Sequence, residues 1–257
     1  MAVAGRHKPP ADRILPQPPL LMLVADRGFF GGDEAWLEAL DRVAAAIMVV
    51  SDAKAAETMA AKNGVHPAAD GVSPTGRWPG ILIQLRVKEL AVQSREQLVS
   101  AGLVRARAAG VPVLLNGTEA EARRLGFDGV HWPEISIPAR RRPPAAAAAR
   151  LVRSAAVHSA VAVGRAEAAG ADLVVFGPVF TSGTKAGVGT AALAEVVRRS
   201  NLPVLAIGGI DAARVAACLA AGAAGVAVVS AVFAAAVDPR ATLRDLCGAL
   251  ATPAARA

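Results

Sequence analysis

The residues of this chain that are best suited to chemistry follow short apolar runs, in segments rich in glycine, hydroxyl and basic side chains. Gln84, Arg86 and Lys88 alternate along one extended segment, so their side chains face the same side. The guanidinium of arginine presents several N–H donors in one plane, and the ammonium of lysine is a compact positive charge. Together they can bind the oxygens of a phosphate or pyrophosphate. We therefore predict that Arg86 and Lys88 bind an anion, although two ordinary surface charges would give the same pattern.

A second candidate for anion binding is the segment Phe176–Gly187, which contains Ser182, Thr184 and Lys185. Its backbone amides, hydroxyls and lysine offer donors to an anion, but their spacing is not that of a Walker loop. A merely flexible connection is the alternative. We expect a functional loop, because binding residues concentrate in loops that a rigid scaffold positions.

The pairs Gly208-Gly209 and Val229-Ser230 predict a phosphate site. Glycines let backbone N–H groups approach a phosphate closely, and a following helix directs its positive end to the same place. A tight turn that needs glycine only for its conformation is the alternative. The loops after the seventh and eighth strands of an α/β barrel often form such a site.

Two histidines are candidates for proton transfer, because the ordinary pKa of histidine lies near 6.5. His158 follows a run of small residues, and His131 ends the preceding apolar run. A histidine at the end of a strand is often structural. We favour His158 because it lies among the predicted phosphate-binding loops.

All of these candidates follow short apolar runs of the β type, with alanine-rich helical stretches between the runs. Eight runs begin at Leu20, Ile81, Val111, Asp128, Leu151, Asp172, Leu202 and Ala224. Parallel strands buried on both faces show this pattern, and eight of them close a barrel. We predict an α/β protein with one (β/α)₈ TIM-barrel domain and an active site at the carboxyl ends of its strands.

The predicted barrel spans residues 19–252, after a flexible N-terminal arm of residues 1–18. Helices should begin near Asp33, Thr118 and Asp211, which are residues of the N-cap type. The segment 49–80 is longer than an ordinary barrel connection, and we interpret it as an insertion of helix then loop before the second strand.

Composition excludes several other functions. The 257 residues are 54% hydrophobic but contain no apolar run of the ~18 residues that a membrane span needs. The first residues, rich in proline and charge, have no apolar h-region of the kind found in signal peptides, so we expect no export. The charge of +7 is dispersed except at Arg140–Arg142, and tyrosine is absent, so we expect no nucleic acid partner. Cys218 and Cys247 fit buried thiols. We expect a cytoplasmic protein, with homo-oligomerisation left open.

Taken together, these segments resemble the thiamine phosphate synthase and TenI family over about residues 19–240. The matching segments are QLRVK, LLNG, DGVH, VHS, VVFGPVF-TSGTK, PVLAIGGI and AGVAVVSAVF. In the synthase branch, a pyrimidine methyl diphosphate loses pyrophosphate, and the nitrogen of a thiazole phosphate captures the resulting cation. The resemblance implies a pyrophosphate site at Arg86, Lys88, Ser182, Thr184 and Lys185. It implies a site for the thiazole phosphate at Gly208, Gly209, Val229 and Ser230, with Gln84 and Asn116 as further pocket residues.

The chain departs from the synthase pattern where that pattern has metal-binding aspartates. The expected positions hold Gly117 and Ser136, so the resemblance implies no metal ligand there. Glu134 or Glu119 could replace them, although neither stands at the matching position. Mg²⁺, which would neutralise the leaving pyrophosphate, is expected only if the protein is a synthase.

The TenI branch has Asn-Gly at this place and a Val-His-Ser segment like Val157-His158-Ser159. Its enzymes move one proton to aromatise a thiazole carboxylate phosphate without a metal. We therefore expect a thiamine-pathway enzyme that binds a thiazole phosphate, with a tautomerase that uses His158 slightly preferred. The alternative is a synthase that also binds a pyrimidine diphosphate. A third hypothesis is a non-catalytic, regulatory phosphate-binding homologue.

Overall fold

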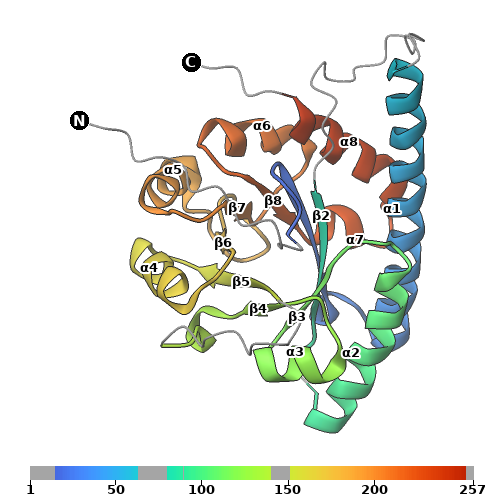
Figure 1. Cartoon of the computed structure of the whole chain (residues 1–257), viewed down its shortest axis with the longest axis horizontal. Helices are drawn as coiled ribbons and strands as arrows, with labels where there is room; N and C mark the ends of the chain where they lie inside the picture. Colours follow the sequence, from blue (N-terminus) through green and yellow to red (C-terminus); the bar gives the residue numbers. More distant parts are fainter. Residues whose placement is uncertain (1–14, 63–79, 89, 140–150, 253–257) are drawn as a thin grey trace.

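The computed structural model describes residues 15–62, 80–88, 90–139 and 151–252, and within them eight parallel strands close into a barrel (Figure 1). The strands are β1 (Leu20–Asp26), β2 (Gly80–Arg86), β3 (Val113–Asn116), β4 (Gly129–Trp132), β5 (Val152–Val157), β6 (Leu173–Phe176), β7 (Val204–Ile207) and β8 (Gly225–Val228). They lie in sequence order around the barrel, and β8 pairs with β1. The predicted (β/α)₈ barrel is confirmed.

Helices cover the outside of the barrel. They are α1 (Asp33–Lys62), α2 (Val92–Arg107), α3 (Glu119–Leu125), α4 (Ala160–Ala169), α5 (Gly189–Arg199), α6 (Ala212–Ala220), α7 (Ser230–Phe233) and α8 (Pro239–Ala251). Two 3₁₀ turns, η1 (Arg27–Phe29) and η2 (Glu134–Ser136), follow β1 and β4. The long α1 packs between α2 and α8 along one side of the barrel (Figure 1).

The predicted helix starts are partly confirmed. Thr118 and Asp211 cap α3 and α6 by accepting a hydrogen bond from a backbone N–H three residues ahead. Asp33, in contrast, is the first residue of α1 and not its cap. Each of the two confirmed helices directly follows a strand end that carries candidate site residues.

The helix predicted in the first part of segment 49–80 is confirmed, but it is not separate from the preceding helix, because α1 continues without a break to Lys62. The first half of the supposed insertion is therefore the end of a helix of 30 residues. The physical reason is that Ala53–Lys62 is rich in the good helix formers alanine, lysine, glutamate and methionine, and the first strong breaker is Gly64. The remaining residues, 63–79, lie outside the described part of the chain.

The barrel is closed by a close approach of β8 to β1. Leu20 pairs with Gly80 on one side and with Gly225 on the other. A Cβ atom at Gly225 would meet the carbonyl oxygen and the amide nitrogen of Leu20, so only glycine allows the two backbones to lie this close.

The interior of the barrel changes from apolar to polar towards the carboxyl ends of the strands. Its lower layers are buried and apolar, and are built mainly from Leu20, Met22, Val24, Leu82, Leu114, Val152, Leu173 and Leu205. Leu15 packs against this cluster, so the chain joins the barrel within the segment that we had predicted to be a flexible arm. Residues 1–14 lie outside the described part.

Other sequence predictions concern single residues. Cys218 and Cys247 are buried free thiols, as predicted, and burial raises their pKa values to about 11 and about 12. In the described part of the chain, no helix has the length and apolar character needed to cross a membrane. The basic cluster Arg140–Arg142 lies outside the described residues.

Candidate functional site

A pocket of about 270 Å³ opens at the carboxyl ends of β8, β1 and β2. It is lined by Asp26, Arg27, Gly28, Phe29, Arg86, Lys88 and Val229. Three of these side chains are cationic and one is anionic, so the pocket favours an anionic ligand. Its position at the C-terminal end of the barrel is the position in which active sites of this fold occur.

Asp26 organises the pocket. It ends β1 opposite Arg86 of β2, forms an ion pair with the guanidinium of Arg86, and accepts a hydrogen bond from the N–H of Gly28 at 3.3 Å. The side chains of Asp26 and Arg86 are about one quarter exposed, at 24% and 28%. Arg86 is therefore held in place at the wall of the pocket while still reachable by a ligand.

The end of β1 and the residues after it contribute to the pocket, although the sequence pattern did not mark them as candidates. Asp26, Arg27, Gly28 and Phe29 line the pocket but were not among the candidates. A signal was present, because Asp26 and Arg27 are charged residues directly after the first predicted strand. Residues at the carboxyl ends of barrel strands surround the active site, so their position alone marks them as candidates.

A buried polar layer forms the floor of the mouth. Gln84, Asn116, His131 and Ser154 are each at most 7% exposed. Gln84 and Ser154 alternate with the interior residues Leu82 and Val152, so they also face the inside of the barrel. This arrangement brings the two predicted pocket residues, Gln84 and Asn116, to the floor of the mouth.

His131 is fixed in its neutral form. Its Nδ1 lies 2.9 Å from the Oγ of Ser154 on the neighbouring strand. Burial, followed by the nearby positive charges of Arg86 and Lys88, lowers the pKa of His131 to about 3. His131 therefore carries no charge near neutral pH, and it serves the site as a neutral hydrogen-bonding group.

His158 lies in a different environment, just beyond the end of β5. It is exposed, and its Nδ1 donates a hydrogen bond of 2.7 Å to the carbonyl oxygen of Gly177. A carbonyl oxygen only accepts, so Nδ1 carries the proton and Nε2 of the neutral ring is available as a base. The carboxylate of Glu134 accepts a hydrogen bond of 2.8 Å from the backbone N–H of His158.

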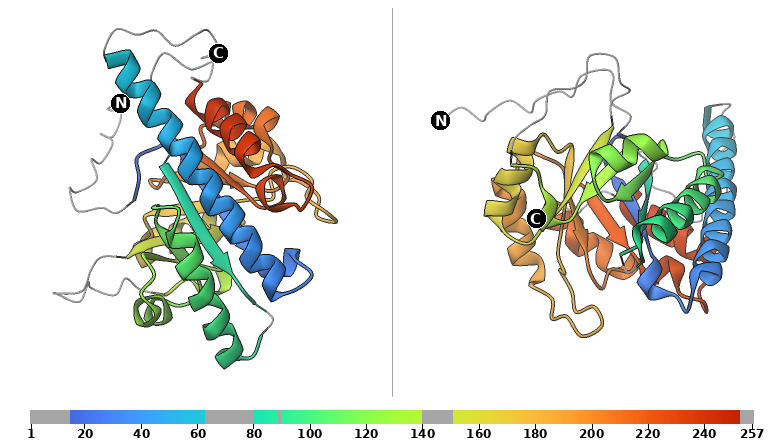
Figure 2. Two further views of the ribbon diagram at one scale, coloured as in Figure 1. Left: turned by 90° about the vertical axis from the view of Figure 1, so that its right-hand side faces the viewer. Right: turned by 90° about the horizontal axis from the view of Figure 1, so that it is seen from below.

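The loop after β6 projects from the end of the barrel at which β2 ends (Figure 2). Ser182 and Lys185 exchange two backbone hydrogen bonds of 3.0 and 3.1 Å, which form a tight hairpin around Gly183 and Thr184. All four residues are exposed. Of the predicted pyrophosphate residues, Arg86 and Lys88 line the pocket described above, whereas Ser182, Thr184 and Lys185 are not among its lining residues, and their role stays a prediction.

Gly208 and Gly209 join the loops after β6 and β7. Both have positive φ angles, of 101° and 60°. A Cβ atom at Gly208 would stand 2.5 Å from the Cα of Pro178, and one at Gly209 would meet the carbonyl oxygen of Thr181. The positive φ angles agree with the alternative of a tight turn that needs glycine for its conformation, and the packing of the two loops is a further reason for both glycines. Phosphate binding by these residues stays a prediction.

The predicted residues after β8 begin a short helix. Val229 is half-buried and lines the pocket, and Ser230 is the exposed first residue of α7. Val229 therefore brings the predicted phosphate loop next to Arg86 and Lys88.

The described residues do not fit a Mg²⁺ ion at the positions that the resemblance implied. They contain no group of three or more histidine, cysteine or acidic residues placed to hold a metal. Glu119 faces the helix-covered side of β5, where it pairs with Arg153 and Arg123. Burial raises its pKa, but the hydrogen bonds from these arginines outweigh burial and lower the pKa below its ordinary value. Glu134 is engaged by the N–H of His158.

The fold and the site define a class of protein: a (β/α)₈ barrel with a cation-lined pocket at the carboxyl ends of its strands. A family model described as thiamine monophosphate synthase matches residues 47–232. The chain belongs to this family, which acts in thiamine biosynthesis.

Individual relatives support this assignment. The thiamine-phosphate synthase of Roseiflexus sp. (strain RS-1) is 37% identical over 210 residues, or 80% of this chain and 85% of the relative. The thiamine-phosphate synthase of Methanoculleus marisnigri is 42% identical over 160 residues, or 59% of this chain and 73% of the relative. A solved structure, thiamine phosphate pyrophosphorylase from Pyrococcus furiosus, has a TM-score of 0.59 at 22% identity and covers 90% of this chain and 95% of its own. That likeness shows the shared fold.

Proposed function

We propose that this chain catalyses the thiamine phosphate synthase reaction. The bond between the pyrimidine methylene carbon and the diphosphate oxygen breaks, and its electron pair leaves with the pyrophosphate. The nitrogen lone pair of a thiazole phosphate then forms the new C–N bond. The names of the relatives favour this reaction, which the sequence analysis placed second to the tautomerase.

The observation that carries the proposal is the convergence of Arg86, Lys88 and Val229 on one pocket. Arg86 and Lys88 would bind the pyrophosphate and stabilise the negative charge that develops as it leaves. Val229 lies in the segment expected to hold the thiazole phosphate, so both anions would meet beside the polar floor. The ion pair with Asp26 would orient Arg86 for this role.

The test is product formation from the two purified substrates with excess Mg²⁺ in the buffer. We expect thiamine phosphate, detected as its fluorescent oxidation product, in amounts that increase with enzyme concentration. No product from folded protein at saturating concentrations of both substrates and Mg²⁺ would contradict the synthase proposal. Calorimetry with thiazole phosphate would then show whether the protein binds this ligand without turnover, as the regulatory hypothesis requires.

The tautomerase remains a second candidate because of the geometry at His158. The hydrogen bond to Gly177 leaves Nε2 as the basic nitrogen of the neutral ring, which is the arrangement needed to remove one proton and return it elsewhere. Gly117 and Ser136, in place of the aspartates, agree with a reaction that uses no metal. The ultraviolet absorbance of the aromatising thiazole tests this activity directly, and no change above the uncatalysed rate would remove the candidate.

A further inference from the structure

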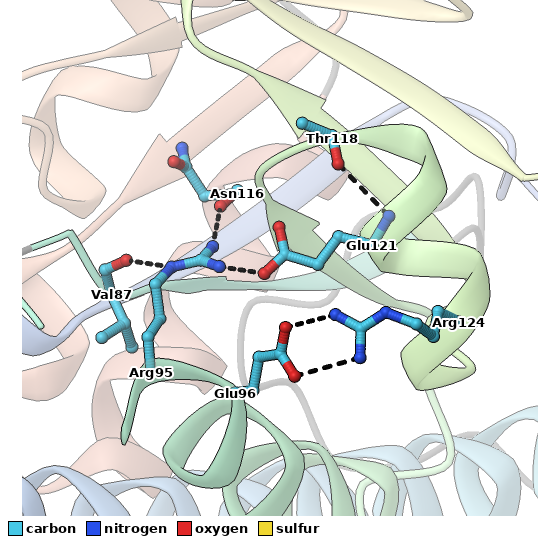
Figure 3. Close-up of polar contacts among 7 residues, drawn as sticks. All are labelled: Val87, Arg95, Glu96, Asn116, Thr118, Glu121 and Arg124. Carbon is cyan, nitrogen blue, oxygen red and sulfur yellow. Dashed lines mark hydrogen bonds and ion pairs between the residues drawn. The ribbon is translucent and has the colours of Figure 1, made fainter. Parts of the chain in front are cut away.

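A partly buried arginine connects the two strand ends that carry predicted site residues. Arg95, in the first turn of α2, donates a hydrogen bond of 2.8 Å from Nε to the carbonyl oxygen of Val87 (Figure 3). It donates a second bond of 2.8 Å from Nη2 to the carbonyl oxygen of Asn116. Val87 lies between Arg86 and Lys88, so one guanidinium holds both the anion-binding segment after β2 and the end of β3.

Glu121 fixes this guanidinium from the opposite side. Its Oε1 forms an ion pair with Nη1 of Arg95, and each of the two side chains is only 16% exposed. Glu121 stands in the first turn of α3, where Thr118 caps the helix by accepting a hydrogen bond from the N–H of Glu121 (Figure 3). The position of the carboxylate is therefore set by a capped helix and a charge partner.

The pair occupies the space next to Gly117. A Cβ atom at position 117 would lie 2.6 Å from Oε2 of Glu121 and 3.2 Å from Nη2 of Arg95. The carboxylate of Glu121 thus stands where a side chain at position 117 would begin. The resemblance implied an aspartate at this position, and the described structure places an ion pair there.

We propose that the Arg95–Glu121 pair positions the pyrophosphate-binding segment Arg86–Lys88, in the space that an aspartate at position 117 would occupy. The paired charges sum to zero, and the guanidinium is directed at backbone carbonyls and at Glu121. The pair accordingly holds the loops and does not supply a ligand to a divalent cation. This inference rests on the proposed function in naming pyrophosphate as the anion.

The experiment compares two ion pairs that lie close together in Figure 3. Glu121→Gln weakens the hold on Arg95, whereas Glu96→Gln weakens the outer pair of Glu96 with Arg124, whose arginine is 55% exposed. Calorimetry on the full chain measures the Kd for pyrophosphate, once with Mg²⁺ and once with a chelator. We expect Glu121→Gln to weaken binding about tenfold under both conditions, and Glu96→Gln to change it by less than about twofold.

A rescue variant separates positioning from general destabilisation. Glu121→Ala removes the side chain that fills this space, so Gly117→Asp combined with Glu121→Ala places a carboxylate at position 117 within reach of Arg95 and should restore most of the pyrophosphate affinity that Glu121→Ala alone loses. Thermal unfolding of each variant confirms that it folds. Equal effects of Glu121→Gln and Glu96→Gln would overturn the proposal.

A direct titration with Mn²⁺, followed by electron paramagnetic resonance, tests the metal alternative. Binding that is present in the wild type and lost in Glu121→Gln would overturn the proposal by making Glu121 a metal ligand. All of these measurements are independent of turnover. If the protein formed no thiamine phosphate but Glu121→Gln still weakened pyrophosphate binding, the proposed function would be wrong and the positioning role of the pair would still be supported.

Discussion

The two sides of the barrel mouth differ in what they offer a substrate. On the side formed by β8, β1 and β2, which we call the cationic side, Asp26, Arg86, Lys88 and Val229 line an open pocket. On the side formed by β4, β5 and β6, which we call the histidine side, His131 is buried with Ser154, and His158 is exposed beside Gly177. The cationic side is therefore the proposed place for the anions, whereas the histidine side carries the candidate for proton transfer, His158.

The comparison also shows how strand register decides the behaviour of a side chain. His131 belongs to the apolar run that forms β4, whereas His158 comes directly after the next run, which forms β5. The first is buried and stays neutral, and the second remains in contact with solvent. The position of a histidine relative to the end of its strand therefore decides whether it is buried in the barrel or exposed to solvent.

The largest expected effect is on the cationic side. Arg86→Ala should lower kcat/KM for the synthase reaction by about 10²–10³-fold, because it removes a charged donor to the leaving pyrophosphate. Arg105→Ala is the matched control, because Arg105 forms an exposed ion pair with Asp41 away from the pocket. Steady-state kinetics with varied pyrimidine diphosphate measure both variants. A similar decrease in kcat/KM in Arg86→Ala and Arg105→Ala would show that Arg86 does not bind the leaving pyrophosphate.

A smaller but still large effect is expected on the histidine side if the chain aromatises the thiazole. His158→Ala should slow that reaction by about 10²-fold or more, since a positioned acid or base contributes at least this much. His158→Gln, which can still donate to Gly177 but cannot carry the proton, should be equally slow. The synthase rate should change little. Wild-type aromatisation rates in both variants would remove His158 from the chemistry.

The third prediction concerns the pH dependence of stability. Because the folded pKa of His131 is about 3, far below the value near 6.5 of an unfolded chain, the unfolded state binds the extra proton between these values. The stability that His131 contributes is complete above pH 6.5 and is lost as the pH falls towards 3. His131→Gln should therefore remove up to about 1.4 kcal/mol per pH unit from the slope of the unfolding free energy in this window.

Urea unfolding between pH 4.5 and 7.5 measures this slope. The comparison uses the change with pH and not the absolute stability, because His131→Gln also alters the packing of the floor. Identical slopes for wild type and variant would mean that His131 is not held neutral by its surroundings.

The smallest expected effect is on the free energy of unfolding, from a contact between the loops that follow β6 and β7. The guanidinium of Arg214 lies over the ring of Phe180, 5.1 Å from its centroid, and also donates a hydrogen bond to the carbonyl oxygen of Gly209. Arg214→Ala should lower the unfolding free energy by about 0.5–1 kcal/mol, in the range of an exposed cation–π contact. Arg240→Ala provides a control on α8. A decrease in the unfolding free energy of more than about 3 kcal/mol would contradict the assignment of this contact as an exposed cation–π interaction.

Much of the fold could be predicted because it depends on local patterns. The eight apolar runs coincide with the eight strands, and Thr118 and Asp211 cap the helices that follow two of them. The end of α1 was mistaken because helix propensity continued past Val49 without a breaker. Arg86, Lys88 and Val229 could be predicted as pocket residues because they stand at the carboxyl ends of strands, and Asp26, which was not predicted, has the same kind of position.

By itself, the sequence determined the barrel and the inward direction of its polar strand ends, since the alternation of side chains along a strand is a local property. The tertiary structure decided which of these groups meet. Asp26 contacts Arg86 across 60 positions, and Arg95 contacts Glu121 across 26. Such pairs depend on strand register and on how the helices pack over the closed barrel, so the spacing of residues along the chain does not reveal them.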